Sequence, residues 1–451
     1  SFAIRYRASI VVLVLLALAT SVPLWPVLAA DSDVDSIGRP GYGYRGHFDL
    51  VKTAITRYGQ LPLWTTLRGA PFVANPGTSP LYPGATLIAL LSANGDVAVR
   101  WVAFVHLVFI SIAGYVLTGW GLRLSRPAAV VGGIVAAFGP WYLYTIQHGT
   151  LLDLMSQPWM YLALALIWRA LADGRKALAV AAGVSAGVAF YAGGSFNLLY
   201  LGLVVALITA AFALEAVYLG VRRHMWQRLA TVVMVILTFS VSALVFAAAK
   251  LVPSAEYVYA YSDRADVSYE TAVSAAVGLR QIGDWLRSGY EPLTLVPTIL
   301  LIVVGGLLGS ARRRGAAVVF GVGALLFTWM TWGPNAPVDL YYIVYRFVPG
   351  FKSNYDIIRM SVAIVMCLVP LAAMGVDVGT GLIRWSVPRM RSDVIVVGTR
   401  RFRRLALITL IATTLLLVAA GLIVQTTRWE RETSVFPWKF HGSVSVGPFN
   451  A

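Results

Sequence analysis

Charged residues and cysteine are both scarce in this sequence. Only 12% of its 451 residues are Asp, Glu, Lys or Arg, whereas 58% are hydrophobic. Soluble domains carry about 25% charged residues, and a chain this apolar would have too little polar surface to cover a core. The sequence is therefore that of an integral membrane protein. The one cysteine, Cys367, stands in an apolar run, which excludes a disulfide framework and a zinc cluster.

Familiar catalytic and nucleotide-binding motifs are missing as well. The sequence has no P-loop, no dinucleotide fingerprint, no H-E-x-x-H and no G-x-S-x-G. It has no row of charges in the middle of an apolar segment, which a proton pump or an ion channel usually requires. No repeat and no low-complexity linker divides the chain. We therefore expect one membrane domain over residues 1–427, followed by a tail at 428–451.

Apolar runs long enough to cross a bilayer recur along the whole chain. A crossing helix needs about 20 apolar residues, and the runs predict an all-α polytopic membrane protein with about 11 transmembrane helices. These predicted spans are residues 8–30, 97–121, 127–146, 151–170, 177–192, 196–219, 229–252, 293–311, 315–333, 359–382 and 405–427. A further stretch, 81–93, is too short to cross and predicts a re-entrant or interfacial helix.

Basic residues gather on one side of these predicted spans. With the N-terminus in the cytoplasm, the cytoplasmic connections hold 20 of the 36 Lys and Arg residues and four acidic residues, which is the whole net charge of +16 (20 − 4). The positive-inside rule thus predicts a cytoplasmic N-terminus and an outer C-terminus. Because topology accounts for the charge, we expect no nucleic-acid partner. The long outer loops, 31–96, 253–292 and 334–358, are then the place for polar chemistry.

The first outer loop is not a random hydrophilic segment. Residues 46–59 place Phe48, Val51, Ile55 and Tyr58 at helical spacing, which predicts an amphipathic helix on the membrane surface. The Pro-, Gly- and Trp-rich run that follows predicts an irregular path, which surrounding protein must support.

Four segments resemble, in chain order, the motifs of one family. They are LPLWTTLRGAPFVANPGTSPLYP (61–83), IQHGTLLDLMSQPWMYLALALIWRAL (146–171), KLVPSAEYVYAYSDRADVSYE (250–270) and YRFVPGFKSNYDIIRMS (345–361). With them the chain resembles the YfhO-like bacterial membrane proteins, which are similar to GT-C glycosyltransferases. The resemblance implies a GT-C-like enzyme of the bacterial cytoplasmic membrane. It would move a sugar from a polyprenyl-phosphate donor to an extracytoplasmic glycan or lipid. The alternative is a non-catalytic scaffold subunit with protein partners in a membrane complex.

Such a transfer needs a base for the acceptor hydroxyl and positive charge or a metal for the leaving phosphate. The resemblance implies a base in the first outer loop, where Asp49 and Asp35 are the candidates. Asp35 ends a D-x-D-x-D run, whose closely spaced oxygens suit a hard cation. The sequence leaves open which aspartate acts and whether a divalent cation (Mg or Mn) takes part. The plainer alternatives are a solvated helix face for Asp49 and a polar exit from the first span for Asp35.

His148 and Asp153 lie at the outer start of the predicted fourth span. Ionisable groups at membrane depth are costly and often functional, so both are candidates for substrate binding. The alternative is helix capping, with Thr150 as the N-cap and Asp153 three residues later.

Two outer arginines, Arg264 and Arg359, are candidates for holding the donor phosphate, because the arginine fork binds phosphate through two hydrogen bonds. Glu256 lies in the same predicted loop as Arg264 and completes the candidate set. For Arg264 the alternative is a salt bridge with a nearby acid. For Arg359 it is snorkelling to lipid headgroups.

Overall fold

The computed structural model describes residues 12–18, 41–65, 70–138, 151–261, 266–274, 276, 311–353 and 357–386. These residues are almost wholly helical, apart from a two-residue ladder in which β1 (Trp64–Thr65) pairs antiparallel with β2 (Ala70–Pro71). Six helices in the described part are long and apolar enough to cross a membrane. The expectation of an all-helical chain suited to a membrane is confirmed, while the eleven-span count and the sidedness stay predictions.

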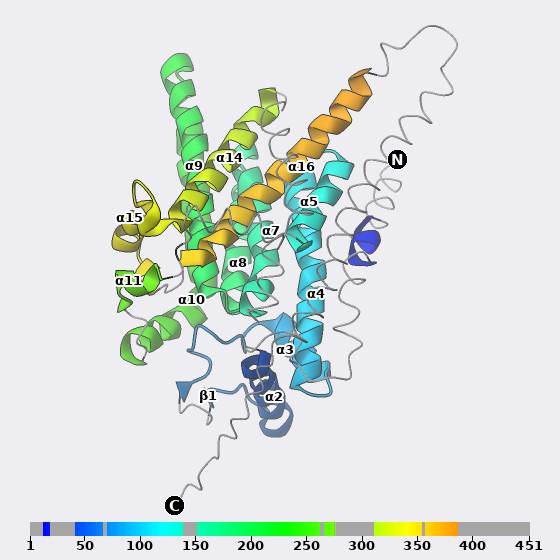
Figure 1. Cartoon of the computed structure of the whole chain (residues 1–451), viewed down its shortest axis with the longest axis vertical. Coiled ribbons are helices and arrows are strands. Elements are labelled where there is room, and N and C mark those ends of the chain that lie inside the picture. Colours follow the sequence, from blue (N-terminus) through cyan, green and yellow to red (C-terminus); the bar gives the residue numbers. More distant parts are fainter. Residues whose placement is uncertain are drawn as a thin grey trace, which may run out of the picture.

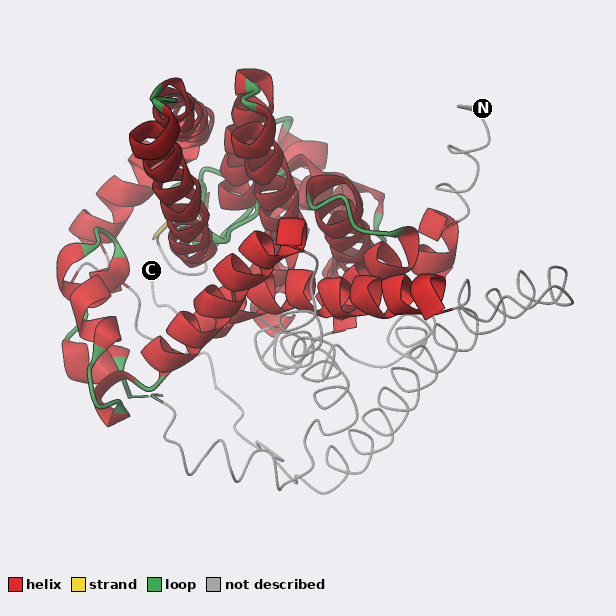
Figure 2. Ribbon diagram, turned by 90° about the horizontal axis from the view of Figure 1, so that it is seen from above, coloured by secondary structure: helices red, strands yellow, loops and turns green. Residues whose placement is uncertain are grey.

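The described helices and helical turns pack into a bundle (Figures 1 and 2). They are α2 (Gly41–Tyr58), α3 (Pro83–Leu91), α4 (Gly95–Val116), the π-helical turn η2 (Leu117–Gly121), α5 (Arg126–Phe138), α7 (Leu151–Asp173), α8 (Lys176–Tyr191), α9 (Ser195–Arg223), α10 (Gln227–Tyr261), α11 (Tyr269–Ala272), α14 (Ala311–Thr331), the 3-10 turn η4 (Gly333–Asn335), α15 (Leu340–Phe347), the 3-10 turns η5 (Phe351–Ser353) and η6 (Ile357–Met360), and α16 (Ser361–Ser386). The predicted spans 293–311 and 405–427 lie outside the described residues.

Helix α7 occupies the centre of the bundle, where it packs against α4, α8 and α9. Helix α16 crosses α5 and α14, and both α7 and α16 are mostly buried. Helix α10 packs against α8 and α9 but leaves most of its apolar surface exposed, including Leu237, Val241 and Leu244. An exposed apolar helix face is the surface that a bilayer covers.

The two ends of the bundle differ in character. An ion pair between Arg123 and Asp173 brings the turns 121–126 and 173–176 together, and we call this the basic end. The opposite end, here the loop end, carries α2, α3 and the 191–195 turn (Figure 1). The positive-inside rule predicts that the basic end is cytoplasmic.

Helix α2 packs part of its predicted apolar face on protein. Phe48 and Val51, two of the residues on its predicted apolar face, are only 4% and 3% exposed, whereas Tyr58 is exposed. The helix contacts α3 and α4. Close approach to α4 depends on Gly95, because a Cβ there would lie 2.4 Å from the carbonyl oxygen of Arg45. The predicted interfacial segment 81–93 does contain a short helix, α3.

Two predicted outer loops contain more helix than expected. Helix α10 continues to Tyr261 through Pro253, so Glu256 lies on an exposed helix turn rather than in a loop. The segment 334–358 holds α15 and the 3-10 turn η5, and α15 begins at the N-cap Asp339, whose side chain accepts a hydrogen bond from the Tyr342 amide. Helix α15 contacts α14 and the turns η4 and η5.

Candidate functional site

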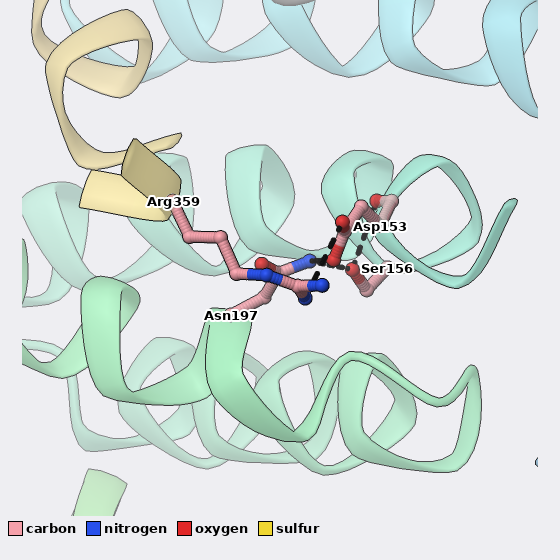
Figure 3. Close-up of polar contacts among 4 residues, drawn as sticks. All are labelled: Asp153, Ser156, Asn197 and Arg359. Atoms are coloured by element: carbon pink, nitrogen blue, oxygen red, sulfur yellow. Dashed lines mark hydrogen bonds and ion pairs between the residues drawn. The ribbon is translucent and has the colours of Figure 1, made fainter. Parts of the chain in front are cut away.

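The carboxylate of Asp153 and the guanidinium of Arg359 face each other at the loop end (Figure 3). Arg359 Nη1 lies 3.8 Å from Asp153 Oδ2, and the two side chains are 21% and 7% exposed. A bidentate arginine–carboxylate pair has N–O distances of about 2.7–2.9 Å, so this pair is a charge contact without that hydrogen-bonded fork. Two residues that the sequence analysis selected separately are thus brought together.

Asp153 is held in place by the first turn of α9. Asn197 Nδ2 donates to Asp153 Oδ1 at 3.0 Å and to Ser156 Oγ at 2.6 Å, while Ser156 Oγ donates to the Asp153 carbonyl at 3.0 Å. The chain reaches this position because Gly194 has no side chain. A Cβ on Gly194 would lie 2.4 Å from Ser156 Oγ. The Asp153 carboxylate therefore joins α7 to α9 and η6. The N-cap of the alternative reading, Thr150, lies outside the described residues.

Arg359 projects from η6 towards α7 and α9 (Figure 3). Its Cζ lies 5.7 Å from the centre of the Phe196 ring, which is a cation–π distance. The guanidinium is thus held between a carboxylate and an aromatic face. One positive and one negative charge nearly cancel, which lowers the cost of placing both in an apolar surrounding.

Two polar atoms next to this pair have unused hydrogen-bonding capacity. Asn197 Oδ1 and Gln157 Nε2 are buried and have no hydrogen-bond partner among the described residues. Gln157 lines a small cavity together with Met160, Tyr161, Val362, Val365 and Met366. Buried polar atoms are rarely left without a partner, so an acceptor and a donor here can bind a water molecule or another small polar group.

Asp49, the favoured base, lies elsewhere on the loop end. Its Oδ1 accepts a hydrogen bond from the Gly95 amide at 2.7 Å, at the start of α4. Lys52 donates to the carbonyl oxygens of Ser92 and Ala93 at 2.5 and 3.0 Å. Asp49 is thus not simply a solvated residue on a helix face, because its carboxylate and Lys52 both bind backbone groups at the α3–α4 junction. Whether Asp49 also acts as a base stays a prediction.

The other predicted site residues do not add to the pair in the described structure. Glu256 is exposed on α10. Asp35, His148 and Arg264 lie outside the described residues. In the described ranges no group of three His, Cys, Asp or Glu side chains could hold a metal ion.

A hydrogen-bonded chain that the sequence analysis did not identify joins α3, α4 and α7. His106 Nδ1 bonds to the Val102 carbonyl at 2.7 Å, which places the proton on Nδ1. His106 Nε2 then accepts from the Tyr82 hydroxyl at 2.8 Å, and Trp159 Nε1 donates to the same hydroxyl at 2.9 Å. Burial raises the pKa of Tyr82 to about 12, although the hydrogen bond from Trp159 acts in the opposite direction.

Lys250 anchors the irregular part of the first loop to the bundle. The side chain is fully buried, and its Nζ donates to the Thr78 carbonyl at 2.5 Å and to the Phe190 carbonyl at 3.4 Å. Nζ also lies 5.5 Å from the Phe190 ring centre. This contact supplies the support that the Pro- and Gly-rich segment was expected to need.

The sequence contains only a weak signal for the residues around Asp153 that the sequence analysis did not select. Ser156, Gln157 and Asn197 are polar residues inside apolar runs, and such residues at membrane depth often have a specific partner. Nothing in the sequence indicates which helix supplies that partner. No protein-family model matches this chain, and no curated protein sequence matches it. The YfhO-like resemblance therefore depends on the four sequence segments alone.

Proposed function

We propose that this chain transfers a sugar from a polyprenyl-phosphate donor to a glycan or lipid acceptor at the loop end of the bundle. The observation that carries the proposal is the Arg359 guanidinium held against Asp153 and Phe196 at that end. Buried side-chain atoms of Asn197 and Gln157 that have no hydrogen-bond partner within the described part of the chain add support. The proposal places the protein in a bacterial cytoplasmic membrane with the loop end outside.

The proposed reaction assigns Arg359 to the leaving group. The acceptor oxygen forms a bond to the sugar's anomeric carbon while the bond from that carbon to the phosphate oxygen breaks. The electron pair leaves with polyprenyl phosphate, and the hydroxyl proton passes to a carboxylate. A fixed cation stabilises the charge that develops on the phosphate. Asp153 is the positioning residue for Arg359, and Asp49 or Asp35 is the predicted base.

The test is release of polyprenyl phosphate by the purified full chain in nanodiscs. A set of polyprenyl-phosphate-linked hexoses is supplied with extracted cell-envelope glycolipid as the acceptor. We expect release by the wild type and a loss of about a hundredfold in R359A, the scale seen when one stabilising donor is removed. R346A is the matched control, because Arg346 is an exposed arginine on α15 at the same end. Undiminished release by R359A would exclude the proposed role of Arg359.

A non-catalytic scaffold is the second candidate. One observation favours it: the charges of Asp153 and Arg359 already neutralise each other in a well-packed surrounding, and the neighbouring cavity is small. This reading predicts that the purified chain releases no polyprenyl phosphate from any of these donors. It also predicts that R359A lowers thermal stability and, like the wild type, releases no polyprenyl phosphate.

A further inference from the structure

Three arginines and a tryptophan meet at the basic end, on the opposite end of the bundle from Asp153. Arg169 Nη2 lies 2.5 Å from Asp173 Oδ2, and Arg123 Nη2 lies 3.4 Å from Asp173 Oδ1. Arg169 Cζ lies 5.5 Å from the Trp120 ring centre. Arg175 follows in the α7–α8 turn, close enough to Arg169 for the two charges to interact. We call Trp120, Arg123, Arg169 and Arg175 the arginine cluster.

An irregular backbone at the end of α4 brings these side chains together. The helix widens into the π-helical turn η2, where the Leu122 amide donates to the Leu117 carbonyl at 2.9 Å. A Cβ on Gly121 would lie 3.2 Å from Ala165 Cα, so η2 packs closely on α7 one turn before Arg169. Arg123 then adopts a left-handed conformation with φ of 57°. Single π turns and left-handed non-glycine residues recur at functional sites.

The arginine cluster carries more positive charge than its own acid neutralises. Asp173 is the one carboxylate paired with it in the described residues, which leaves an excess of two positive charges (3 − 1). Arg169 is only 12% exposed, and its Nε is buried without a hydrogen-bond partner in the described structure. Arg123 is 56% exposed on its side chain, and Arg175 is also exposed. Two accessible arginine forks thus flank one that is largely buried.

Trp120 indicates what kind of anion fits beside these arginines. This residue is 42% exposed at the end of a helix that is long and apolar enough to span a membrane. Tryptophan at such a depth lies among lipid headgroups, and basic residues there attract anionic lipids. Arginine binds phosphate oxygens in a bidentate manner. A phosphate with an attached glycerol and acyl chain matches both the arginines and the ring.

We propose that the arginine cluster binds the phosphodiester of an anionic phospholipid. Arg123 and Arg175 contact the phosphate oxygens. Arg169, which Asp173 orients, adds positive charge without direct contact. The glycerol and acyl chain lie against Trp120. The site does not depend on the proposed transferase activity, because it lies at the other end of the bundle.

The test is native mass spectrometry of the full chain in detergent, titrated with phosphatidylglycerol or phosphatidylcholine. We expect the wild type to retain phosphatidylglycerol selectively. R123Q/R175Q removes the two accessible charges and is expected to weaken that binding about tenfold, while W120L weakens it less. R222Q/R223Q is the matched control, because it removes the same charge from the C-terminal turn of α9. Thermal unfolding of each variant shows that it is folded.

A separate arm identifies the source of the phosphate. Inorganic phosphate at millimolar concentration is added to the phosphatidylglycerol complex, and we expect it not to displace the lipid. Displacement by inorganic phosphate would overturn the lipid proposal, as would equal retention of phosphatidylcholine. Equal losses in R123Q/R175Q and R222Q/R223Q would show general surface attraction and would overturn it too. If R123Q/R175Q is unfolded, the single variants R123Q and R175Q give the same comparison.

Discussion

Arg359 Nη1 lies 3.8 Å from Asp153 Oδ2, although the two residues belong to η6 and to the first turn of α7. Both side chains are largely buried, and Asp153 is additionally bound by Asn197 from α9. The pair therefore joins three segments that are far apart in the sequence. Removing either charge leaves the other one buried without compensation, which costs more than the intact pair contributes.

The first prediction concerns this mutual dependence. We expect D153N and R359M each to lower the free energy of unfolding by about 1–3 kcal/mol, below the values for fully buried pairs because Arg359 is partly exposed. The double variant D153N/R359M should lose less than the sum of the two, because no charge is left alone. Denaturant unfolding in detergent measures the coupling energy. Strict additivity would contradict the described contact.

The second prediction separates two roles of Asp49. Its carboxylate accepts a hydrogen bond from the Gly95 amide at the start of α4, next to the N-cap Asn94, and losing such a hydrogen bond costs about 1 kcal/mol. D49A should therefore lower thermal stability, whereas D49N should keep most of it, because asparagine accepts the same hydrogen bond. A base, however, needs the carboxylate. If D49N is folded and has lost release of polyprenyl phosphate, Asp49 is the base; full release by D49N leaves Asp35 as the candidate.

The third prediction concerns the anchor of the first loop. K250M keeps the length of the side chain but leaves the Thr78 and Phe190 carbonyls without their buried donor. Leaving a buried acceptor without its donor costs about 1–3 kcal/mol, so residues 72–82 should exchange their amide hydrogens faster. Hydrogen exchange with mass spectrometry measures this change. K176M is the control, since Lys176 is exposed, and an equal effect of both variants would refute the anchoring role.

The fourth prediction is a pH dependence at Tyr82. Burial raises its pKa to about 12, against 10.0 for an unperturbed tyrosine. Above pH 10 the unfolded chain releases this proton while the folded chain keeps it. The contribution of the Tyr82 hydroxyl to the free energy of unfolding is therefore complete below pH 10 and is lost between pH 10 and 12. The stability gap between wild type and Y82F should therefore narrow over that range, by roughly 2–3 kcal/mol in total. Unfolding curves at each pH measure the gap.

The control for Tyr82 is Y58F, because Tyr58 is 66% exposed. The difference in unfolding free energy between the wild type and Y82F should change with pH more than the difference for Y58F does. Equal pH dependence of the two variants would show that the Tyr82 hydroxyl is not held in its neutral form by burial.

The long helices could be predicted from the sequence pattern without knowledge of the tertiary structure. The runs that became α4, α7, α9, α10 and α16 are apolar over their whole length, and a helix is what satisfies the backbone of such a run in a membrane. Helix boundaries were less well predicted. The predicted span ended at residue 252, yet α10 continues through Pro253 to Tyr261.

The apolar face of α2 shows a different limit. Spacing identified Phe48 and Val51 as one face of a helix, but spacing does not say whether lipid or protein covers that face. The structure buries both residues in contact with other helices. The same limit applied to Asp49, whose carboxylate accepts a hydrogen bond from Gly95, a residue of another helix.

For the candidate site, the sequence by itself determined which side chains are costly to bury: a few charged and polar residues, Asp153 and Arg359 among them, in or beside apolar runs. Only the tertiary structure decided that these two face each other and that Asn197 holds the carboxylate. Burial cost is a property of one residue type and can be read locally. The partner that offsets this cost depends on how α7, α9 and η6 pack, which no spacing along the chain encodes.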